Sequence, residues 1–356
     1  MLINTFYFSN SDLCGISIFN RHLRKALSRI GLDVLDTNLR TATEVVRAPI
    51  EILHYAPGSY ASPDASAALI QLLSSQRHSQ KLCVVIHGLH SYGESRFSHG
   101  NTYPQNEEHI RLMLQAAESI CALSSSAARA CRTWQSQLGG DSRLHTLNHP
   151  GLFQPTLTTS WIDAGYALLA GISRTKKINS SGPIITLLDR CRHQGVRVLE
   201  HWTNVRFSAP TDRSWKQTYG FASDMAWSNL VSNARVVLCP YQTRVQAVSG
   251  VMSEAISAGR FVLSTSFDLA LEMQEQYPTR VFLEDNLKLW PQLINQLPHT
   301  NGPVVTAIPS WDSFASSLAS ELSGSRSVTG RQEPEFNWQQ TLLEHEQLAC
   351  HSTGAY

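Results

Sequence analysis

Short apolar runs alternate with longer amphipathic segments along most of the chain. The apolar and aromatic run 3–8 is followed by polar turn residues and Gly15, which predicts a buried strand that ends in a loop. In 19–30 the apolar residues recur every three or four positions with basic residues between them, which predicts an amphipathic helix stopped by Gly31. The same analysis predicts further strands at 34–35, 51–55, 82–86 and 120–123, and further helices at 65–73, 109–119 and 126–138.

A second series of the same kind begins after the turn 148–151. It contains predicted strands at 166–170, 196–199, 236–238 and 261–263, and predicted helices at 184–192, 224–231 and 253–258. Continuous apolar strands that alternate with helices are typical of parallel sheets covered by helices on both faces. The pattern therefore predicts an α/β fold of two Rossmann-like, doubly wound domains. Their expected limits are 1–155 and 156–308, followed by a helix at 309–323 and a loosely ordered tail at 324–356.

Composition narrows the class of protein. The 356 residues include 29 Lys+Arg and 28 Asp+Glu, so there is no basic excess of the kind that nucleic-acid backbones require. The seven cysteines form no CxxC pair, which favours a reduced compartment. The N-terminus lacks a signal-peptide pattern, and no apolar run reaches the length of a membrane span. A cytoplasmic protein is expected, and a periplasmic-type binding protein is disfavoured.

The stretch 239–266 holds the strongest candidate for chemistry. A strand is followed by a polar loop and then by Ser249, Gly250 and Val251 at the start of a helix. Gly250 lets a ligand approach the backbone, and free N–H groups at a helix start favour a diphosphate. Glu254, one turn further on, could accept both hydroxyls of a ribose. The alternative is an ordinary strand–turn–helix with a solvated glutamate.

This stretch resembles the donor-site signature of retaining GT-B glycosyltransferases, the group often called family 4. Pro240 follows the strand, Glu254 is followed by Ala255, and Gly259 precedes the next strand, as in that signature. In the family an earlier glutamate faces the transferred sugar, but this sequence has Gln246 at that position. The resemblance implies that Gln246 contacts the sugar without charge and that Glu254 holds the ribose.

Other pieces of the family pattern occur in the same order over about residues 1–323. They are the loop with Gly15, a strand that ends in His87, Ser124 before a helix, the turn 147–151 and the helix that starts near Trp311, which in the family returns to the first domain. The resemblance implies the GT-B fold, in which the two domains face a central cleft. It also implies that His87 contacts the donor sugar or the acceptor. The alternative for His87 is a structural role in the core.

The family opens its second domain with a glycine, followed by an arginine and a lysine. These two cations neutralise the leaving diphosphate. Lys177 falls in the lysine position, whereas Ile172 occupies the arginine position and Arg174 lies two residues further on. The resemblance therefore implies phosphate contacts for Lys177 and Arg174. A solvated basic turn is the alternative. The long polar loop 88–106 is expected to shape the acceptor site.

The sequence contains no Asp-x-Asp pair, no P-loop, no GxGxxG and no zinc spacing, so we expect neither a metal site nor a cofactor. The expected function is metal-independent transfer, with retention, from a UDP- or GDP-linked sugar to a glycan, a lipid-linked or another hydroxyl acceptor. A lipid-linked acceptor would bring the protein into peripheral contact with the inner membrane. The alternatives are a catalytically degenerate GT-B-like partner or co-chaperone of an active transferase, and a nucleotide-sugar epimerase.

Overall fold

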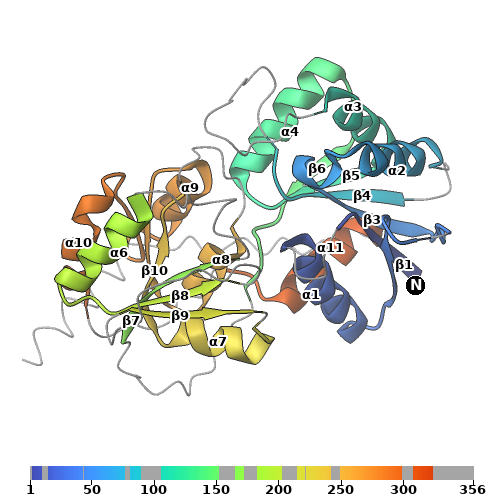
Figure 1. Ribbon diagram of the computed structural model, residues 1–356. Coiled ribbons are helices and arrows are strands. Elements are labelled where there is room, and N and C mark those ends of the chain that lie inside the picture. The colour runs from blue at the N-terminus through green and yellow to red at the C-terminus, as the bar shows by residue number, and fades with distance from the viewer. Residues whose placement is uncertain are drawn as a thin grey trace, which may run out of the picture.

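The computed structural model describes residues 2–9, 15–42, 44–76, 81–89, 106–151, 165–171, 183–202, 215–220, 222–241, 249–298 and 308–323. They form two halves, each built around a six-stranded sheet with helices packed against it (Figure 1). All described strand pairs are parallel. In parallel sheets the carboxyl ends of the strands share one edge, where ligands bind.

The sheet of the first half has the order β2-β1-β3-β4-β5-β6. Its strands are β1 (Leu2–Tyr7), β2 (Asp33–Asn38), β3 (Ile50–Tyr55), β4 (Lys81–Ile86), β5 (Ser119–Ala122) and β6 (Arg143–Thr146). The helices of this half are α1 (Gly15–Arg29), α2 (Pro63–Ser74), α3 (Glu107–Ala116) and α4 (Ser125–Leu138), with a 3-10 turn η1 (Pro57–Tyr60).

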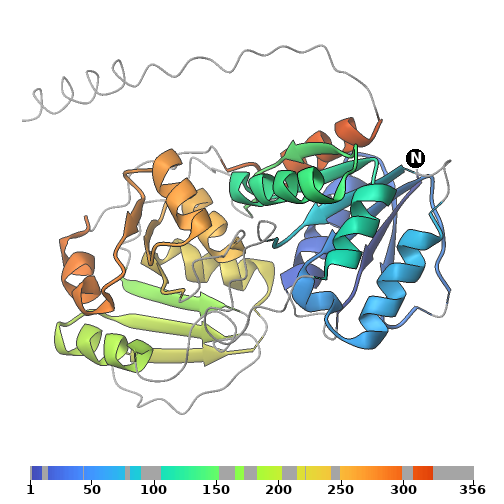
Figure 2. The same cartoon turned by 90° about the horizontal axis from the view of Figure 1, so that it is seen from above.

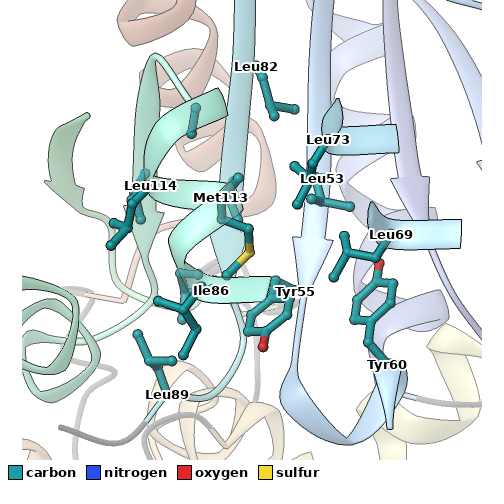
Figure 3. Packing of buried hydrophobic residues seen from close by; sticks show 14 of the residues in the cluster. Leu53, Tyr55, Tyr60, Leu69, Leu73, Leu82, Ile86, Leu89, Met113 and Leu114 are labelled. Carbon is teal, nitrogen blue, oxygen red and sulfur yellow. The ribbon is translucent and has the colours of Figure 1, made fainter. Parts of the chain in front are cut away.

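Apolar clusters cover both faces of this sheet, and its central strands β1, β3, β4 and β5 are buried between them. On one face Leu53 and Ile86 from the strands pack with Leu69 of α2 and Met113 of α3 (Figure 3). The other face is covered by α1, where the apolar stripe predicted from the sequence is buried from Phe19 to Leu27, whereas Ile30 after the helix is exposed. The two layers hold the ends of β3 and β4 in place, and these ends position the residues of the site.

The sheet of the second half has the order β12-β11-β10-β7-β8-β9. Its strands are β7 (Tyr166–Gly171), β8 (Val198–Trp202), β9 (Trp215–Tyr219), β10 (Ala234–Cys239), β11 (Phe261–Ser264) and β12 (Val281–Leu283). The helices are α6 (Pro183–His193), α7 (Asp224–Ser232), α8 (Gly250–Ser257), α9 (Asp268–Gln276) and α10 (Trp290–Gln296), with a 3-10 turn η2 (Leu287–Leu289). Two apolar clusters again cover the two faces.

The last described helix, α11 (Trp311–Ser323), returns to the first half. Trp311, Phe314 and Leu318 join the apolar cluster beneath α1, and both ribbon views show α11 beside α1 (Figures 1 and 2). The chain thus passes between the halves twice. The two passages lie side by side, since the Gly151 amide donates to the Pro309 carbonyl at 3.1 Å.

The predicted alternation of strands and helices is confirmed, with local differences. The helix predicted to reach residue 119 ends at Ala116, because Ala117 has an extended backbone and Ser119 already pairs with Cys83 in the sheet. Strands β6, β9 and β12 and helices α9 and α10 are not evident in the sequence pattern, since they are short and lack long apolar runs. The predicted boundary at 155/156 and the tail 324–356 lie outside the described residues.

Candidate functional site

Helix α8 begins at the carboxyl edge of the second sheet, after β10. Ser249 is its N-cap: the Ser249 Oγ lies 3.4 Å from the Met252 amide and shares a 2.9 Å hydrogen bond with the Tyr241 hydroxyl. This cap takes one of the first amides of the helix. The amides of Gly250 and Val251 have no intrahelical acceptor by helix geometry, so they are available to an anion.

The first half contacts this helix start through His149, which follows β6. A methyl group added at Gly250 would lie 3.4 Å from the His149 Cε1, so the imidazole lies against the bare backbone of Gly250. The His149 Nδ1 is 2.8 Å from the Pro150 carbonyl. The carboxyl edges of the two sheets therefore meet at α8, where the GT-B resemblance expects the ligand.

His87 follows β4 at the same edge of the first sheet and is half-buried. The Phe19 ring of α1 meets it edge-on, with the centroids 4.7 Å apart. Its Nε2 lies 3.0 Å from the Nδ1 of His54 in β3. Burial first, and then the neighbouring His54 and His149, hold the pKa of His87 well below its ordinary value. His87 is therefore a neutral imidazole at neutral pH.

Glu254 is not the solvated surface carboxylate of the alternative interpretation. The indole N–H of Trp227 in α7 donates a hydrogen bond to its Oε2. Burial, and secondly the nearby Asp224 carboxylate, raise the pKa of Glu254 to about 8. In this state its carboxyl group is largely protonated at neutral pH, and it can donate as well as accept hydrogen bonds.

Charged contacts join the two halves on either side of this region. The Asp224 carboxylate at the start of α7 faces α1, with the Lys25 Nζ at 3.4 Å and the His22 Nε2 at 3.4 Å. Burial lowers the pKa of His22 to about 4, partly offset by Asp224, so its imidazole is neutral. Elsewhere the Glu272 carboxylate of α9 accepts from the first amides of α4, Ser125 at 2.9 Å and Ser126 at 3.2 Å.

A cavity of about 210 Å³ lies between α1, the two passages of the chain and the starts of α7 and α11. Its lining includes Lys25 and Arg29 of α1 and the carboxylates of Asp224 and Asp312. The opposite charges are paired across it, since Arg29 also donates to Asp312. The described lining residues therefore offer no unpaired charge to a ligand.

The structure brings His87, Ser249, Gly250 and Val251 to the edge where the halves meet, and places Glu254 one turn along α8. Gly15 begins α1, at the same edge of the first sheet. Arg174, Lys177 and Gln246, together with Ile172 and the greater part of the loop 88–106, lie outside the described residues.

Several residues of this region are not indicated by the sequence analysis. Asn20 and His54 are buried polar side chains inside an apolar helix face and an apolar strand. A polar residue at a position where the pattern expects an apolar one was the available signal. Trp227 and Glu272 gave no such signal, because their partners lie 27 and about 147 residues away along the chain.

Among the described residues, no three His, Cys, Asp or Glu side chains gather in a way that could hold a metal ion. In the same part of the chain, every helix is too short or too polar to cross a bilayer.

The sequence matches no protein-family model and no curated protein. Solved structures do resemble it. WaaG, a glycosyltransferase involved in lipopolysaccharide biosynthesis, has a TM-score of 0.60 at 14% identity, over 91% of this chain and 100% of that chain. HepE of Anabaena, solved with UDP and glucose, has a TM-score of 0.59 at 13% identity, over 90% and 99%.

A UDP-GlcNAc 2-epimerase from Methanocaldococcus jannaschii has a TM-score of 0.53 at 9% identity, over 90% of this chain and 99% of that chain. The likeness therefore extends through both halves, at identities that show the fold alone. Together with the two parallel sheets and their order, it establishes that this chain has the GT-B fold.

Proposed function

We propose that the protein is a glycosyltransferase that moves a sugar from a nucleotide-diphosphate sugar to a glycan, a lipid-linked or another hydroxyl acceptor. The observation that carries the proposal is the start of α8, with a Ser249 cap and a bare Gly250, at the edge where it meets His149 of the other half. In a GT-B fold this edge is where a ligand can contact both halves at once.

The diphosphate of the donor is proposed to bind the amides of Gly250 and Val251. The positive end of the helix dipole favours charge that develops on the departing phosphate. Lys177 and Arg174 are proposed as the cations that neutralise it, as the family resemblance implies. The sequence has no Asp-x-Asp pair to clamp a metal ion, so we propose that these groups act without one.

Glu254 is proposed to hold the ribose. Its Oε2 is occupied by the Trp227 indole, whereas its Oε1 has no partner among the described residues. A protonated carboxyl group can donate to one ribose hydroxyl and accept from another. The known complex of HepE contains UDP and glucose, which supports UDP as the first donor to test.

His87 and Gln246 are proposed to orient the sugar. Transfer with retention needs no protein nucleophile if the departing phosphate accepts the proton of the acceptor hydroxyl, as the resemblance implies. The acceptor oxygen then bonds to the anomeric carbon as the bond to the phosphate oxygen breaks. Movement of the two halves toward each other would exclude water and limit hydrolysis of the donor.

Titration calorimetry with UDP, GDP, ADP and their sugar conjugates tests the proposal. We expect one nucleotide to bind saturably and the Glu254→Ala variant to bind it about tenfold more weakly, as expected for the loss of a hydrogen bond to the ribose. Glu275→Ala is the matched control, because Glu275 is exposed on α9 and outside the site. It should bind the nucleotide as the wild type does.

Failure to bind any of the nucleotides would overturn the proposal and favour the non-catalytic partner of an active transferase. Conversion of the sugar nucleotide in the absence of an acceptor would favour an epimerase, the activity named for one of the structures with this fold.

A further inference from the structure

Four polar side chains form a continuous hydrogen-bonded chain from the surface of the first half to His87. The Asn20 Nδ2 lies 2.7 Å from the Asp36 Oδ1, and the Asn20 Oδ1 lies 3.1 Å from the His54 Nε2. The His54 Nδ1 in turn lies 3.0 Å from the His87 Nε2. Asn20 is 1% exposed and His54 0% exposed, so water does not take part in the link between these two residues.

Asp36 fixes which partner donates in each of these hydrogen bonds. Its carboxylate forms an ion pair with Arg24 and can only accept hydrogen bonds. Asn20 must therefore turn its amide NH₂ toward Asp36 and its carbonyl oxygen toward His54. That oxygen can only accept, so the His54 Nε2 carries the hydrogen of this link.

The same reasoning assigns the ring hydrogens of His54 and His87. Burial lowers the pKa of His54 to about 3, so the ring carries one hydrogen, on Nε2, and its Nδ1 is an acceptor. His87 must donate its Nε2–H to that acceptor. Because His87 is also neutral, its Nδ1 carries a lone pair and no hydrogen. Among the described residues this Nδ1 has no hydrogen-bond partner.

We infer that Asp36, Asn20 and His54 are positioning residues that hold His87 in the Nε2–H tautomer, so that its Nδ1 accepts a hydrogen bond from a hydroxyl group of the bound sugar. The identity of the ligand rests on the proposed function, whereas the tautomer does not. A neutral acceptor matches a hydroxyl donor and gives no attraction to a phosphate. If the four residues only stabilised the core, ligand binding would not depend on which ring nitrogen of His87 carries the hydrogen.

Asp36→Asn is the sharpest variant, because Asp36 lies at the surface end of the chain. An amide at position 36 can donate as well as accept, so Asn20 can turn over and present its NH₂ to His54. In molecules where Asn20 turns over, every link runs in the opposite direction and His87 carries its hydrogen on Nδ1, so both tautomers of His87 are populated. His54→Phe removes the acceptor for His87 while it keeps a flat ring in the core.

Long-range ¹H–¹⁵N spectra of the full chain with ¹⁵N-labelled histidine, recorded near neutral pH, show the tautomer directly. The His87 signals are identified by their loss in His87→Gln. We expect the Nε2–H pattern in the wild type and a mixture of both tautomers in Asp36→Asn and in His54→Phe. Asp33→Asn, an exposed residue of the same strand β2, should leave the wild-type pattern unchanged.

A charged or Nδ1–H His87 in the wild type would overturn the inference. A pattern that stays unchanged in Asp36→Asn would do the same, and this variant replaces only a surface carboxylate by its amide, so the test does not depend on His54→Phe folding.

The ligand is tested by calorimetry with a sugar nucleotide and with the bare nucleotide. We expect His54→Phe to weaken binding of the sugar nucleotide about tenfold and to leave the bare nucleotide unchanged, since only the sugar supplies the hydroxyl. Equal weakening of both would overturn the hydroxyl contact. If the wild type binds neither compound, the proposed function fails while the tautomer experiment still decides the positioning role.

Discussion

At Glu254 a carboxyl group is held in surroundings that disfavour its charge. Burial is the larger cause and the Asp224 carboxylate the second, and together they raise the pKa from 4.5 to about 8. In the unfolded chain the same group has its ordinary pKa. The folded state therefore holds the proton more tightly, and the stabilisation that this gives is complete below pH 4.5 and is lost as the pH rises toward 8.

The thermal unfolding midpoint should report this proton. Between pH 4.5 and pH 8 we expect the midpoint of the wild type to fall relative to that of Glu254→Gln, which has no charge to suppress. Glu275→Gln should follow the wild type at every pH, because Glu275 is exposed. Parallel curves for the wild type and Glu254→Gln, measured by differential scanning calorimetry, would contradict the raised pKa.

Individual site residues could be predicted from the sequence where they follow a strand. His87 and Ser249 stand directly after or soon after apolar runs, and parallel strands bring such ends to one edge. The link between His54 and Asn20 could not be predicted in this way. It depends on the angle at which α1 packs across β3. This angle is set by contacts of the apolar cluster, such as the edge-on contact of the Phe19 ring of α1 with the His54 ring of β3.

Helix α4 starts with amides that are satisfied from the other half of the molecule. Ser124 accepts from the Ala127 amide at 3.0 Å, while Glu272 of α9 takes those of Ser125 and Ser126. A carboxylate at a helix start is also stabilised by the helix dipole. Glu272 therefore acts as a cap supplied across the interface between the halves.

Glu272→Ala should leave two poorly solvated amides at the start of α4 without acceptors. We expect a loss of about 1–3 kcal/mol of stability, the usual cost of unsatisfied buried donors, seen as a lower midpoint in urea. Glu275→Ala, in the same helix but exposed, should lie within about 0.5 kcal/mol of the wild type. A midpoint for Glu272→Ala that matches this control would show that the amides find other acceptors.

The elements themselves were predictable in proportion to their apolar content. Strands β3 and β10 are buried along their whole length and β4 from its second residue on, and 82–86 and 236–239 are unbroken apolar runs. Strand β6, Arg143–Thr146, lies at the edge of its sheet with half-buried and exposed residues, so its pattern is too weak to separate from a loop. Edge strands need less apolar surface, which is the physical reason that they escape detection.

The first passage between the halves lies tightly against α8 at Gly151. A Cβ at this position would lie 2.3 Å from the Ser257 Oγ and 2.6 Å from the Ser257 Cβ, closer than such atoms approach in proteins. Gly151 belongs to the first passage between the halves, and Ser257 ends α8. A side chain here must therefore displace α8 or the passage itself.

Gly151→Ala is expected to lower the thermal midpoint by several degrees, as overpacking costs about 1–3 kcal/mol. The double variant Gly151→Ala/Ser257→Gly removes both opposing atoms and should recover part of the loss. Ser257→Gly alone is the control for the cost of a glycine at a helix end, at most about 1 kcal/mol. No recovery in the double variant would locate the strain elsewhere.

At the scale of the whole molecule, the alternating pattern was sufficient to predict two parallel sheets, and the family resemblance implied the returning helix. The way the halves meet was not predictable, because the contacts that fix it join distant parts of the chain. Lys25 and Asp224 are 199 residues apart, and Arg29 and Asp312 are 283 apart. Charged residues on a helix face are usually solvated, so their sequence gives no sign of a partner.

Because α11 returns to the first half, the positions of two dyes must be chosen with care if they are to report a motion of the halves. Dyes on β1 and on α11 would both travel with the first half, and energy transfer between them would not change as the halves move. A pair at Ile30 and Leu289, 38% and 42% exposed, would place one dye on each half. The five cysteines that the structure describes are buried, so cysteines introduced at these two positions would react ahead of them with a thiol-specific dye.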